Sequence, residues 1–523
     1  MMRKKALAIV TCLSLTGSLL AACANKDDKN AAGNGNGSPA APPTIKLIVG
    51  DRNMPYVTSS PNLNEDKYVK KMRELSKTDV RIEAINQGDY AKKLNLLFAS
   101  GDLPDAIQAV NGITAPEVAS ALSNGAFYEL NDLIDKYAPS LKTKISKEMW
   151  NSSLVSKDGK IYAIPREAPT PNNRIVYIRK DWMDKLGLQA PKTVDEYLNV
   201  LRAFRDKDPN GNGKADEIPF IGRKNFDFGY VFFGAYDVSP EGWKFVNNQL
   251  VPNFIRPQMK DALKLHQQMY QEKLIDNEVF INMATDWVTK IENTQRVGMW
   301  IHAAEYPDKT ATGYKKLSPP VEFINIPAPT GPDGKGGNLI GSVVDPLSTW
   351  VIPKTNKHPE YVLKFLEWML SDEAQDFLNY GLEGEDYTVE NGKKVPKPWS
   401  TKADSDKDQM HTQWLRFIGP SYIHNQEFMK TRENGQLVTS ALKIATTEGR
   451  VNDGLDMPIP PSLESKPELQ FTGLWMELAA KIITGREPLD SFDKFVEDWK
   501  KRGGDKVIQE ATDWYVKNNQ AKK

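Results

Sequence analysis

The chain has 523 residues, of which 40% are hydrophobic, and its 68 basic and 68 acidic side chains are spread without long blocks. A single hydrophobic core rarely serves so many residues, so we expect two lobes or more. The balanced charge provides no basic face, which argues against nucleic acid as a partner.

The N-terminal segment is typical of a secretory signal. Arg3, Lys4 and Lys5 precede an apolar run that extends from Ala6 to Leu20 and ends in Leu-Ala-Ala-Cys at Cys23. The run is too short for a stable membrane span. Its ending resembles a bacterial lipobox, in which the cysteine receives acyl chains such as palmitate and becomes the new N-terminus. We therefore expect a signal peptide over residues 1–22 and a body anchored by lipid at Cys23 to the extracytoplasmic face of the cell membrane. The alternative is an ordinary signal in which a cysteine follows two alanines by chance.

Removal of this signal would change both the cysteine count and the charge. Cys12 would leave with it, so Cys23 would be the only cysteine of the mature chain, which excludes a disulfide scaffold, a zinc ribbon and a thiol enzyme. Loss of the three basic residues would leave 65 basic against 68 acidic groups, a net charge of −3. The next stretch, to residue 43, is rich in Gly, Asn, Pro and Ala without an apolar period, so residues 23–43 are predicted to form the lipidated cysteine and a flexible tether.

Strands and helices are predicted to alternate from residue 44 onward. The strands are predicted over 45–49, 80–85 and 106–110, and the helices over 64–75, with Asn64 as N-cap, and over 90–98. This alternation predicts α/β lobes with parallel sheets, in which ligands bind beyond the carboxyl ends of strands. Asp51-Arg52-Asn53 and Asn111-Gly112 occupy such ends, although turn and capping roles explain the same residues.

Five dispersed motifs carry a family resemblance. They are ASGDLPD at 99–105, GKIYAIP at 159–165, YIRKDWMDKLGLQAPKTVDEY at 177–197, SDEAQ at 371–375 and GLEGEDY at 381–387. Together they resemble family 1 extracellular solute-binding proteins of ABC importers, in the long lipoprotein branch that is similar to alginate-oligosaccharide-binding members.

The resemblance implies a two-lobe, type II periplasmic-binding-protein fold with a ligand cleft between the lobes and several chain crossings as hinge. By analogy, lobe one is expected at 44–166 and 341–391, and lobe two at 167–340 and 392–523. The implied function is capture of an oligosaccharide and its delivery to an ABC permease, by a monomer. A surface sensor with the same fold is the alternative, and a polysaccharide-degrading enzyme is a more distant one.

The run DKDPNGNGKADE, from Asp206 to Glu217, is rich in side-chain oxygens on alternate positions around two glycines. Such a loop suits Ca²⁺, which takes roughly 6–8 oxygen ligands. A first frame starts at Asp206 and matches the EF-hand pattern. The preferred frame is similar to the calcium loop of the alginate-oligosaccharide binders, and it uses Asp208, Asn210, Asn212, the carbonyl of Lys214, Asp216 and Glu217. The ion is expected to be structural. An Asx-rich turn without metal is the alternative.

Carbohydrate ligands need flat apolar surfaces and polar groups for their hydroxyls. Trp300 ends a predicted strand, at a place where the family's strand leads into the cleft, and Trp350 lies at the expected return to lobe one. Core packing is the alternative for both tryptophans. The full set of candidate ligand-binding residues is Trp300, Trp350, Glu383, Asp386, Tyr387, Tyr177 and Arg179.

Catalytic motifs do not emerge from the sequence. The five histidines are scattered without an HExxH pair, and no G-x-S-x-G elbow occurs. We expect a binding protein rather than an enzyme.

Overall fold

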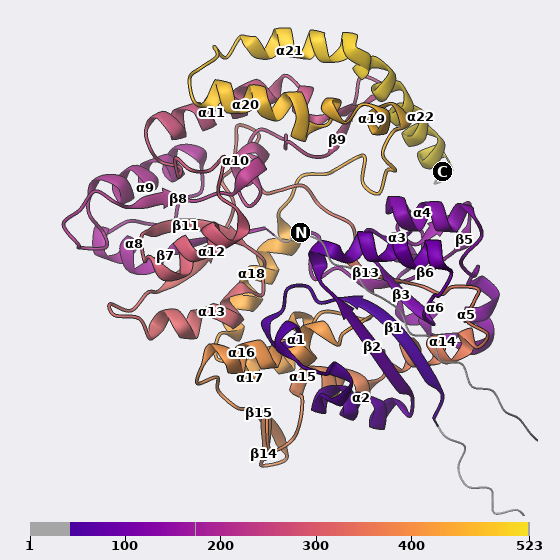
Figure 1. Cartoon of the computed structure of the whole chain (residues 1–523). Coiled ribbons are helices and arrows are strands. Elements are labelled where there is room, and N and C mark those ends of the chain that lie inside the picture. The colour runs from indigo at the N-terminus through magenta and orange to yellow at the C-terminus, as the bar shows by residue number, and fades with distance from the viewer. Residues whose placement is uncertain (1–41, 173, 521–523) are drawn as a thin grey trace, which may run out of the picture. The chain divides into compact units, whose positions relative to one another are not determined.

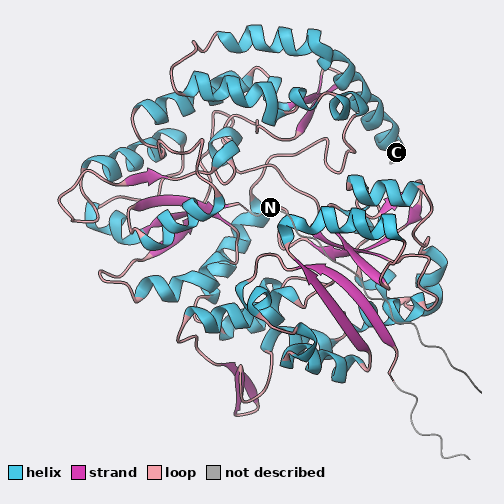
Figure 2. Ribbon diagram, in the orientation of Figure 1, coloured by secondary structure: helices cyan, strands magenta, loops and turns pink. Residues whose placement is uncertain are grey.

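The computed structural model describes residues 42–172 and 174–520 (Figure 1). Cys23 and the predicted signal and tether up to residue 41 lie outside the described residues. Helices and strands are mixed through the described part (Figure 2). In that part, no helix combines the length and the apolar character that a membrane span needs.

The first sheet has five strands in the order β2-β1-β3-β13-β6. Strand β1 pairs in parallel with β2 and β3, whereas β13 runs antiparallel to both of its neighbours. The predicted strands at 45–49, 80–85 and 106–110 are confirmed in this sheet. Its strands are β1 (Thr44–Gly50), β2 (Asp79–Ile85), β3 (Ala106–Ala109), β6 (Ala163–Glu167) and β13 (Val344–Val351).

Helices from three parts of the chain accompany this sheet. They are α1 (Pro55–Ser59), α2 (Lys67–Ser76), α3 (Tyr90–Ser100), α4 (Pro116–Ser123), α5 (Asn131–Tyr137), α6 (Ser140–Lys144), α7 (Lys147–Trp150), α14 (Pro359–Trp368), α15 (Asp372–Tyr380) and α16 (Lys402–Gln409).

The N-terminus of α2 differs from the prediction. Asp66, rather than Asn64, caps the helix and accepts from the backbone N–H groups of Tyr68 and Val69. Asn64 instead pairs with the backbone of Ile82 in β2, and two hydrogen bonds across the sheet edge outweigh one local cap.

The second sheet has four strands in the order β12-β7-β11-β8. Strand β11 is parallel to β8 but antiparallel to β7, so this sheet is mixed rather than parallel. Its strands are β7 (Ile175–Arg179), β8 (Ile218–Phe220), β11 (Val297–His302) and β12 (Phe323–Ile326). The accompanying helices are α8 (Lys180–Leu186), α9 (Val194–Asp206), α10 (Val231–Gly234), α11 (Gln258–Gln271), α12 (Ala284–Asn293), α13 (Tyr306–Lys315), α17 (Gln426–Thr431) and α18 (Gly435–Thr447).

The last helices pack around α11. Trp475 and Trp499 lie in one buried cluster with Phe254 and Leu263. These helices are α19 (Pro461–Ser465), α20 (Met476–Ile483), α21 (Ser491–Trp499) and α22 (Asp505–Gln520). Three short hairpins complete the described elements: β4 (Ser156–Lys157) with β5 (Lys160–Ile161), β9 (Trp243–Val246) with β10 (Gln249–Pro252), and β14 (Tyr387–Glu390) with β15 (Lys393–Pro396).

One part of the C-terminal segment lies with the first sheet. Met410, Trp414 and Phe417 belong to the buried cluster of that sheet, and the Trp414 indole donates to the carbonyl of Gly50 at 3.0 Å. The expectation that 392–523 packs mostly on lobe two therefore needs a correction for 410–418. Their apolar side chains fill the face of the first sheet, and nothing in their local sequence distinguishes one lobe from the other.

Candidate functional site

Trp300 is part of the core of the second sheet. Its side chain is 1% exposed, and its ring lies 6.2 Å from that of Tyr177 and 5.3 Å from that of Phe323. Strand β11 has a neighbour on each side, and both of its faces are covered. The expectation that Trp300 stacks on a ligand is thus corrected, because a ring enclosed by other rings offers no free face.

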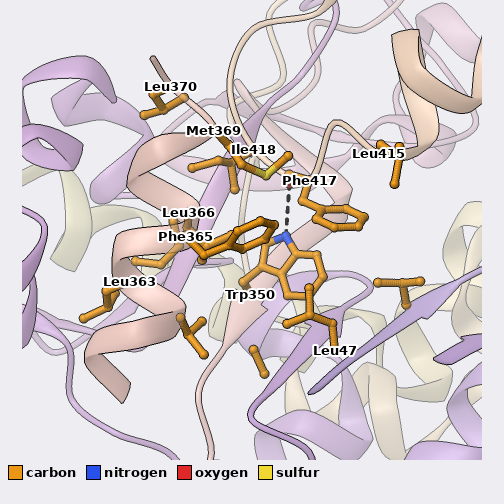
Figure 3. Close-up of a cluster of buried hydrophobic side chains, with 14 of the residues drawn as sticks. Leu47, Trp350, Leu363, Phe365, Leu366, Met369, Leu370, Leu415, Phe417 and Ile418 are labelled. Atoms are coloured by element: carbon orange, nitrogen blue, oxygen red, sulfur yellow. Dashed lines mark hydrogen bonds between the residues drawn. The ribbon is translucent and has the colours of Figure 1, made fainter. Parts of the chain in front are cut away.

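Trp350 is likewise a core residue, in the cluster of the first sheet (Figure 3). It is fully buried, and its indole N–H donates to the carbonyl of Phe417 at 3.0 Å. Leu47 and Phe365 pack in the same cluster. The return of the chain to the first sheet therefore brings Trp350 into the interior and not to a ligand surface.

Tyr177 and Arg179 are engaged inside the second sheet. The hydroxyl of Tyr177 donates to the carbonyl of Ala303 at 2.8 Å, and the guanidinium of Arg179 pairs with the Asp181 carboxylate at 2.5 and 2.7 Å. Since β7 runs antiparallel to β11, Arg179 lies at the opposite edge from the carboxyl end of β11. There it lines a hollow of about 560 Å³ together with Asn210 and Asn212. Tyr177 is fully buried, which corrects its expected ligand role, whereas the ligand role of Arg179 stays a prediction.

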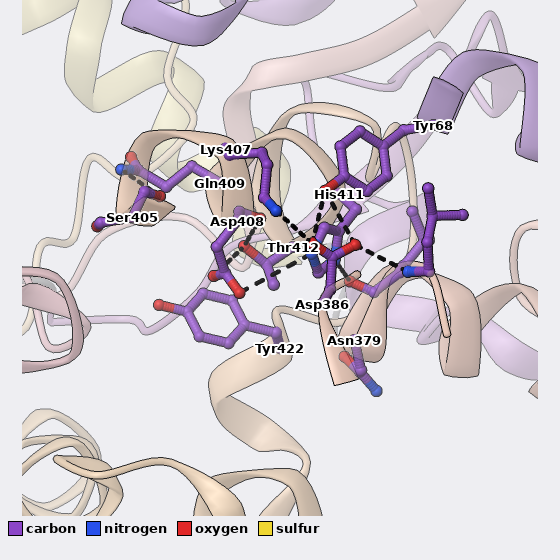
Figure 4. Close-up of polar contacts among 12 residues, drawn as sticks. Tyr68, Asn379, Asp386, Ser405, Lys407, Asp408, Gln409, His411, Thr412 and Tyr422 are labelled. Carbon is purple, nitrogen blue, oxygen red and sulfur yellow. Dashed lines mark hydrogen bonds and ion pairs between the residues drawn. The ribbon is translucent and has the colours of Figure 1, made fainter. Parts of the chain in front are cut away.

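The loop that holds Glu383, Asp386 and Tyr387 connects parts of the fold (Figure 4). The Asp386 carboxylate accepts from the Tyr68 hydroxyl at 2.8 Å and from the Leu382 backbone N–H at 2.9 Å, and it pairs with Lys407 at 2.9 Å. Burial opposes ionisation of Asp386, but these donors outweigh it and hold its pKa below the ordinary value.

The other two residues of this loop differ in exposure. Tyr387 is 7% exposed beneath Lys394, whereas Glu383 is exposed. The expected ligand role for Asp386 and Tyr387 is corrected to a structural one, and the structure gives Glu383 no partner side chain among the described residues.

Buried polar atoms without a hydrogen-bond partner indicate a different candidate ligand site. Segments 168–172 and 338–344 lie in the connections between the two sheets and run side by side, with the Ala168 N–H donating to the carbonyl of Val343 at 2.9 Å. Thr170 Oγ1, Asn172 Oδ1 and Asn338 Oδ1 are buried along these segments, and none has a hydrogen-bond partner among the described residues. A buried polar atom left unpaired costs roughly 1–3 kcal/mol. Such a concentration therefore marks a place for a polar molecule.

The carboxyl edge of the first sheet adds charged groups to this place. Arg166 is the penultimate residue of β6, close to segment 168–172, and it is 4% exposed. Its Nε lies 3.7 Å from the carboxylate of Asp345, at the start of β13. Arg52 follows β1 at the same edge with a left-handed backbone, at φ 53°. The sequence flagged Arg52 as a strand-end residue but missed Arg166, for which a charged side chain near the end of a strand that begins with apolar residues was the available signal.

The corresponding edge of the second sheet carries a strained aromatic loop. Residues 222–230 follow β8, and Asn225, Phe226 and Phe228 have φ between 56° and 62°, a costly conformation for residues with a side chain. The guanidinium groups of Arg174 and Arg223 lie 4.2 and 5.0 Å from the centre of the Phe228 ring. Strain of this kind concentrates at ligand sites.

The predicted ion loop follows α9 and is built around Asp208. Its carboxylate accepts from the backbone N–H groups of Gly211, Asn212 and Gly213 at 3.0–3.1 Å, and both glycines adopt left-handed φ. The carboxylate of Asp216 accepts from the side-chain amides of Asn210 and Asn212. The polar side chains of the loop thus form hydrogen bonds within the loop itself.

Glu217 closes this loop with two unsatisfied oxygens. Both carboxylate oxygens are buried without a partner among the described residues. Burial is the main cause that raises the pKa of Glu217, and Asp208 and Asp216 add to it. In the described part of the chain, no three His, Cys, Asp or Glu side chains are grouped closely enough to hold a metal by themselves. The amide and carbonyl oxygens would have to complete the donor set, and an oxygen-rich set with an unpaired carboxylate fits a hard cation such as Ca²⁺.

Comparison with known proteins decides the family. Residues 61–376 match the family described as bacterial extracellular solute-binding protein. The chain belongs to this family. Three curated relatives are similar to it: polygalacturonan/rhamnogalacturonan-binding protein YtcQ of Bacillus subtilis (27% identical over 97% of each chain), lipoprotein LipO of the same organism (26%, 98% of each), and the fructooligosaccharide ABC transporter substrate-binding protein FusA of Streptococcus pneumoniae (30%, 71% of this chain and 70% of the relative).

Solved structures of solute-binding proteins share the fold. Alginate-binding protein AlgQ2 without calcium ion superposes with a TM-score of 0.67 over 91% of this chain and 98% of that chain, at 24% identity. An EF-hand mutant of FusA from S. pneumoniae, in complex with fructo-nystose, gives 0.66 over 92% and 100%, at 23%. The predicted two-lobe α/β fold and the family resemblance are both confirmed.

Proposed function

We propose that this solute-binding protein is the oligosaccharide-binding lipoprotein of an ABC importer, and that it delivers its ligand to the permease without chemical change. The relatives named for sugar binding and transport support the class of ligand. The observation that carries the proposal to particular residues is the row of unpaired polar atoms of Thr170, Asn172 and Asn338 along the segments that join the two sheets.

These atoms suit sugar hydroxyls. A hydroxyl both donates and accepts, so one hydroxyl can donate to an amide oxygen of Asn172 or Asn338 and accept from a neighbouring N–H. The strained loop 222–230 carries two half-buried aromatic side chains, Phe228 and Tyr230, at the edge of the second sheet. A ligand bound here would contact both lobes. It would favour the arrangement in which the lobes are closed around it, because more of its contacts form in that state.

The ion loop gives the protein a structural calcium site in this proposal. The oxygens of Asp208, Asn210, Asn212, Asp216 and Glu217, with the carbonyl of Lys214, would hold the ion. Asp206 stays outside this set because Arg205 binds its carboxylate at 2.6 and 2.7 Å, which favours the frame that starts at Asp208. Calcium would supply the positive charge that the buried carboxylate oxygens of Glu217 lack among their neighbours.

Lipid at Cys23 would hold the body at the membrane. Persistent anchoring takes two or more acyl chains, and it raises the effective concentration of the binding protein near its permease. The similarity to lipoprotein LipO supports this part of the proposal.

Calorimetry of the purified body tests the function. Neutral and acidic oligosaccharides are titrated in turn, and each mixture is then analysed by chromatography. We expect at least one oligosaccharide to bind and to be recovered intact. At a ligand concentration of one hundred times the dissociation constant, binding should raise the free energy of unfolding by about 2.7 kcal/mol. Cleavage products would favour an enzyme, and binding of no saccharide would refute the proposal.

A further inference from the structure

Buried arginines in this protein are usually paired with carboxylates. Arg432 bonds both Asp308 and Asp408, and Arg256 bonds Asp237 at 3.0 Å. Such pairing is the rule, because an isolated buried charge costs several kcal/mol. Any arginine that departs from this pattern needs an explanation.

Arg166, which is buried, and Arg52, which is half-buried, depart from it. Arg166 is buried, yet its Nε and Nη1 have no hydrogen-bond acceptor among the described residues, and neither has Nη2 of Arg52. Burial, with repulsion from Arg166 as the second cause, lowers the pKa of Arg52 to about 10. The two guanidinium groups therefore lie close enough to repel each other.

A third arginine adds positive charge behind them. Arg416 is fully buried and donates only to neutral oxygens, those of Thr412, Gln375, Pro420 and Asn379. Burial and then repulsion from Arg166 lower its pKa to about 9. Its bonds are complete, so it is not available to a ligand, but its charge remains uncompensated.

The acidic groups nearby do not balance the three arginines. Asp345 lies 3.7 Å from Arg166, beyond hydrogen-bond distance, and also accepts from the Leu347 N–H. Glu305 is the other carboxylate that acts on Arg166, and its Oε2 is buried without a partner among the described residues. The carboxylate of Asp51 is used by neutral donors of Asn53, Asn86 and Gln87.

Arg52 and Arg166 lie at the proposed ligand site. Strands β1 and β6 run in the same direction, so Arg52 and Arg166 both lie at the carboxyl edge of the first sheet, with Asp345 of β13 between these strands. Arg166 is also close to segment 168–172, which carries Thr170 and Asn172.

We propose that Arg52 and Arg166 bind an acidic group of the ligand, and that the oligosaccharide carried by this protein is therefore anionic. Guanidinium groups match the planar, bidentate geometry of a carboxylate and also bind a sulfate ester. The inference rests on the proposed function, since it names the ligand class for the same site.

Calorimetry on the whole body of the protein tests the inference with three matched trisaccharides. They are trigalacturonate, its carboxyl-reduced neutral counterpart galactotriose, and a sulfated galactotriose. We expect an acidic trisaccharide to bind about tenfold or more tightly than the neutral one. A preference for the carboxylated or the sulfated sugar identifies the acidic group. Binding of the neutral sugar as tightly as both acidic ones overturns the inference and leaves the proposed function standing, whereas binding of none overturns both.

Variants locate the acidic group. Arg166→Gln and Arg52→Gln should each weaken binding of the acidic trisaccharide about tenfold or more. Binding of the neutral trisaccharide should be less affected. Arg256→Gln is the matched control, as it removes a buried but paired arginine elsewhere, and it should leave the preference intact. Without ligand, Arg166→Gln should unfold at a temperature equal to or higher than that of the wild type, since it removes a buried charge that has no hydrogen-bonded carboxylate. Arg256→Gln should unfold at a lower temperature. An acidic preference that survives in both Arg166→Gln and Arg52→Gln contradicts the assignment.

Discussion

The hydroxyl of Tyr68 donates to the carboxylate of Asp386, at 2.8 and 2.9 Å from its two oxygens (Figure 4). The bond joins α2, near the start of the described chain, to the loop before hairpin β14–β15. Lys407 of α16 pairs with the same carboxylate. One buried acid thus connects three segments that are distant in sequence.

Tyr68→Phe should lower the free energy of unfolding by about 1.5–3 kcal/mol, the range for a hydrogen bond to a charged group. Urea denaturation measures the change. Tyr162→Phe is the control, because no hydrogen bond of the Tyr162 hydroxyl occurs among the described residues, and it should change little. Equal effects of the two substitutions would show that the Asp386 bond does not contribute.

Trp300→Ala should destabilise the protein by about 3–5 kcal/mol, because it opens a cavity among Tyr177, Tyr306 and Phe323. The expected result differs from that of a ligand-stacking residue, which would weaken binding and leave unfolding unchanged. Trp514→Ala, at a partly exposed site on α22, should cost far less. A wild-type denaturation midpoint for Trp300→Ala would contradict the core assignment.

Calcium chelation should lower the melting temperature of the wild type. The double variant Asp208→Ala, Asp216→Ala should melt at the same temperature with and without chelator, because the ion would have lost two carboxylates. Asp206→Asn serves as control and separates the two frames of the loop. It should keep the calcium response if the site starts at Asp208, and a lost response would favour the EF-hand frame. No shift in the wild type would refute the calcium site.

Acid should destabilise the protein through His266. Burial lowers the pKa of His266 to about 4, from an ordinary value of 6.5, beside a ring contact of 3.9 Å with Phe233. Its neutral form is favoured in the fold, so the stabilisation is complete above about pH 6.5 and is lost as the pH falls toward 4. The shift corresponds to about 3 kcal/mol at most. His266→Phe should reduce the loss of stability between pH 6.5 and 4, as measured by urea denaturation across that range. An unchanged pH profile would refute the role of this residue.

Cys23→Ala should release the body from the membrane, because no acyl chain could then be attached. Fractionation of cells that express the full chain measures the release, with Cys12→Ala as the matched control that should remain in the membrane fraction. Retention of the Cys23→Ala variant in that fraction would refute the lipid anchor.

Local patterns in the sequence predicted the fold well. Strands β1, β2 and β3 and helix α3 lie close to their predicted bounds, because the period of the apolar positions is set within a few residues. The direction of β7 was not accessible in this way, since it depends on pairing with β11 more than a hundred residues later. That direction places Arg179 at the opposite edge from the carboxyl end of β11.

The candidate site was harder to predict for a related reason. The sequence flags a tryptophan at the end of a strand, but whether its ring meets a ligand or other rings depends on distant residues such as Phe417 for Trp350. Arg166 was missed because a charged residue is ordinary in sequence. It becomes informative only when the structure shows it buried without an acceptor.

The first sheet and its core draw on three separated stretches of the chain, up to Glu167, around β13 to α15, and at 410–418. An expression fragment that stopped after the first stretch would leave the β3 edge without β13 and the face of the sheet without Trp350 and Trp414. Such a fragment would expose apolar surface and an open strand edge, both of which promote aggregation. A truncated binding module for biosensor use would therefore have to retain the chain through residue 418, with the second sheet carried along as an obligatory insertion.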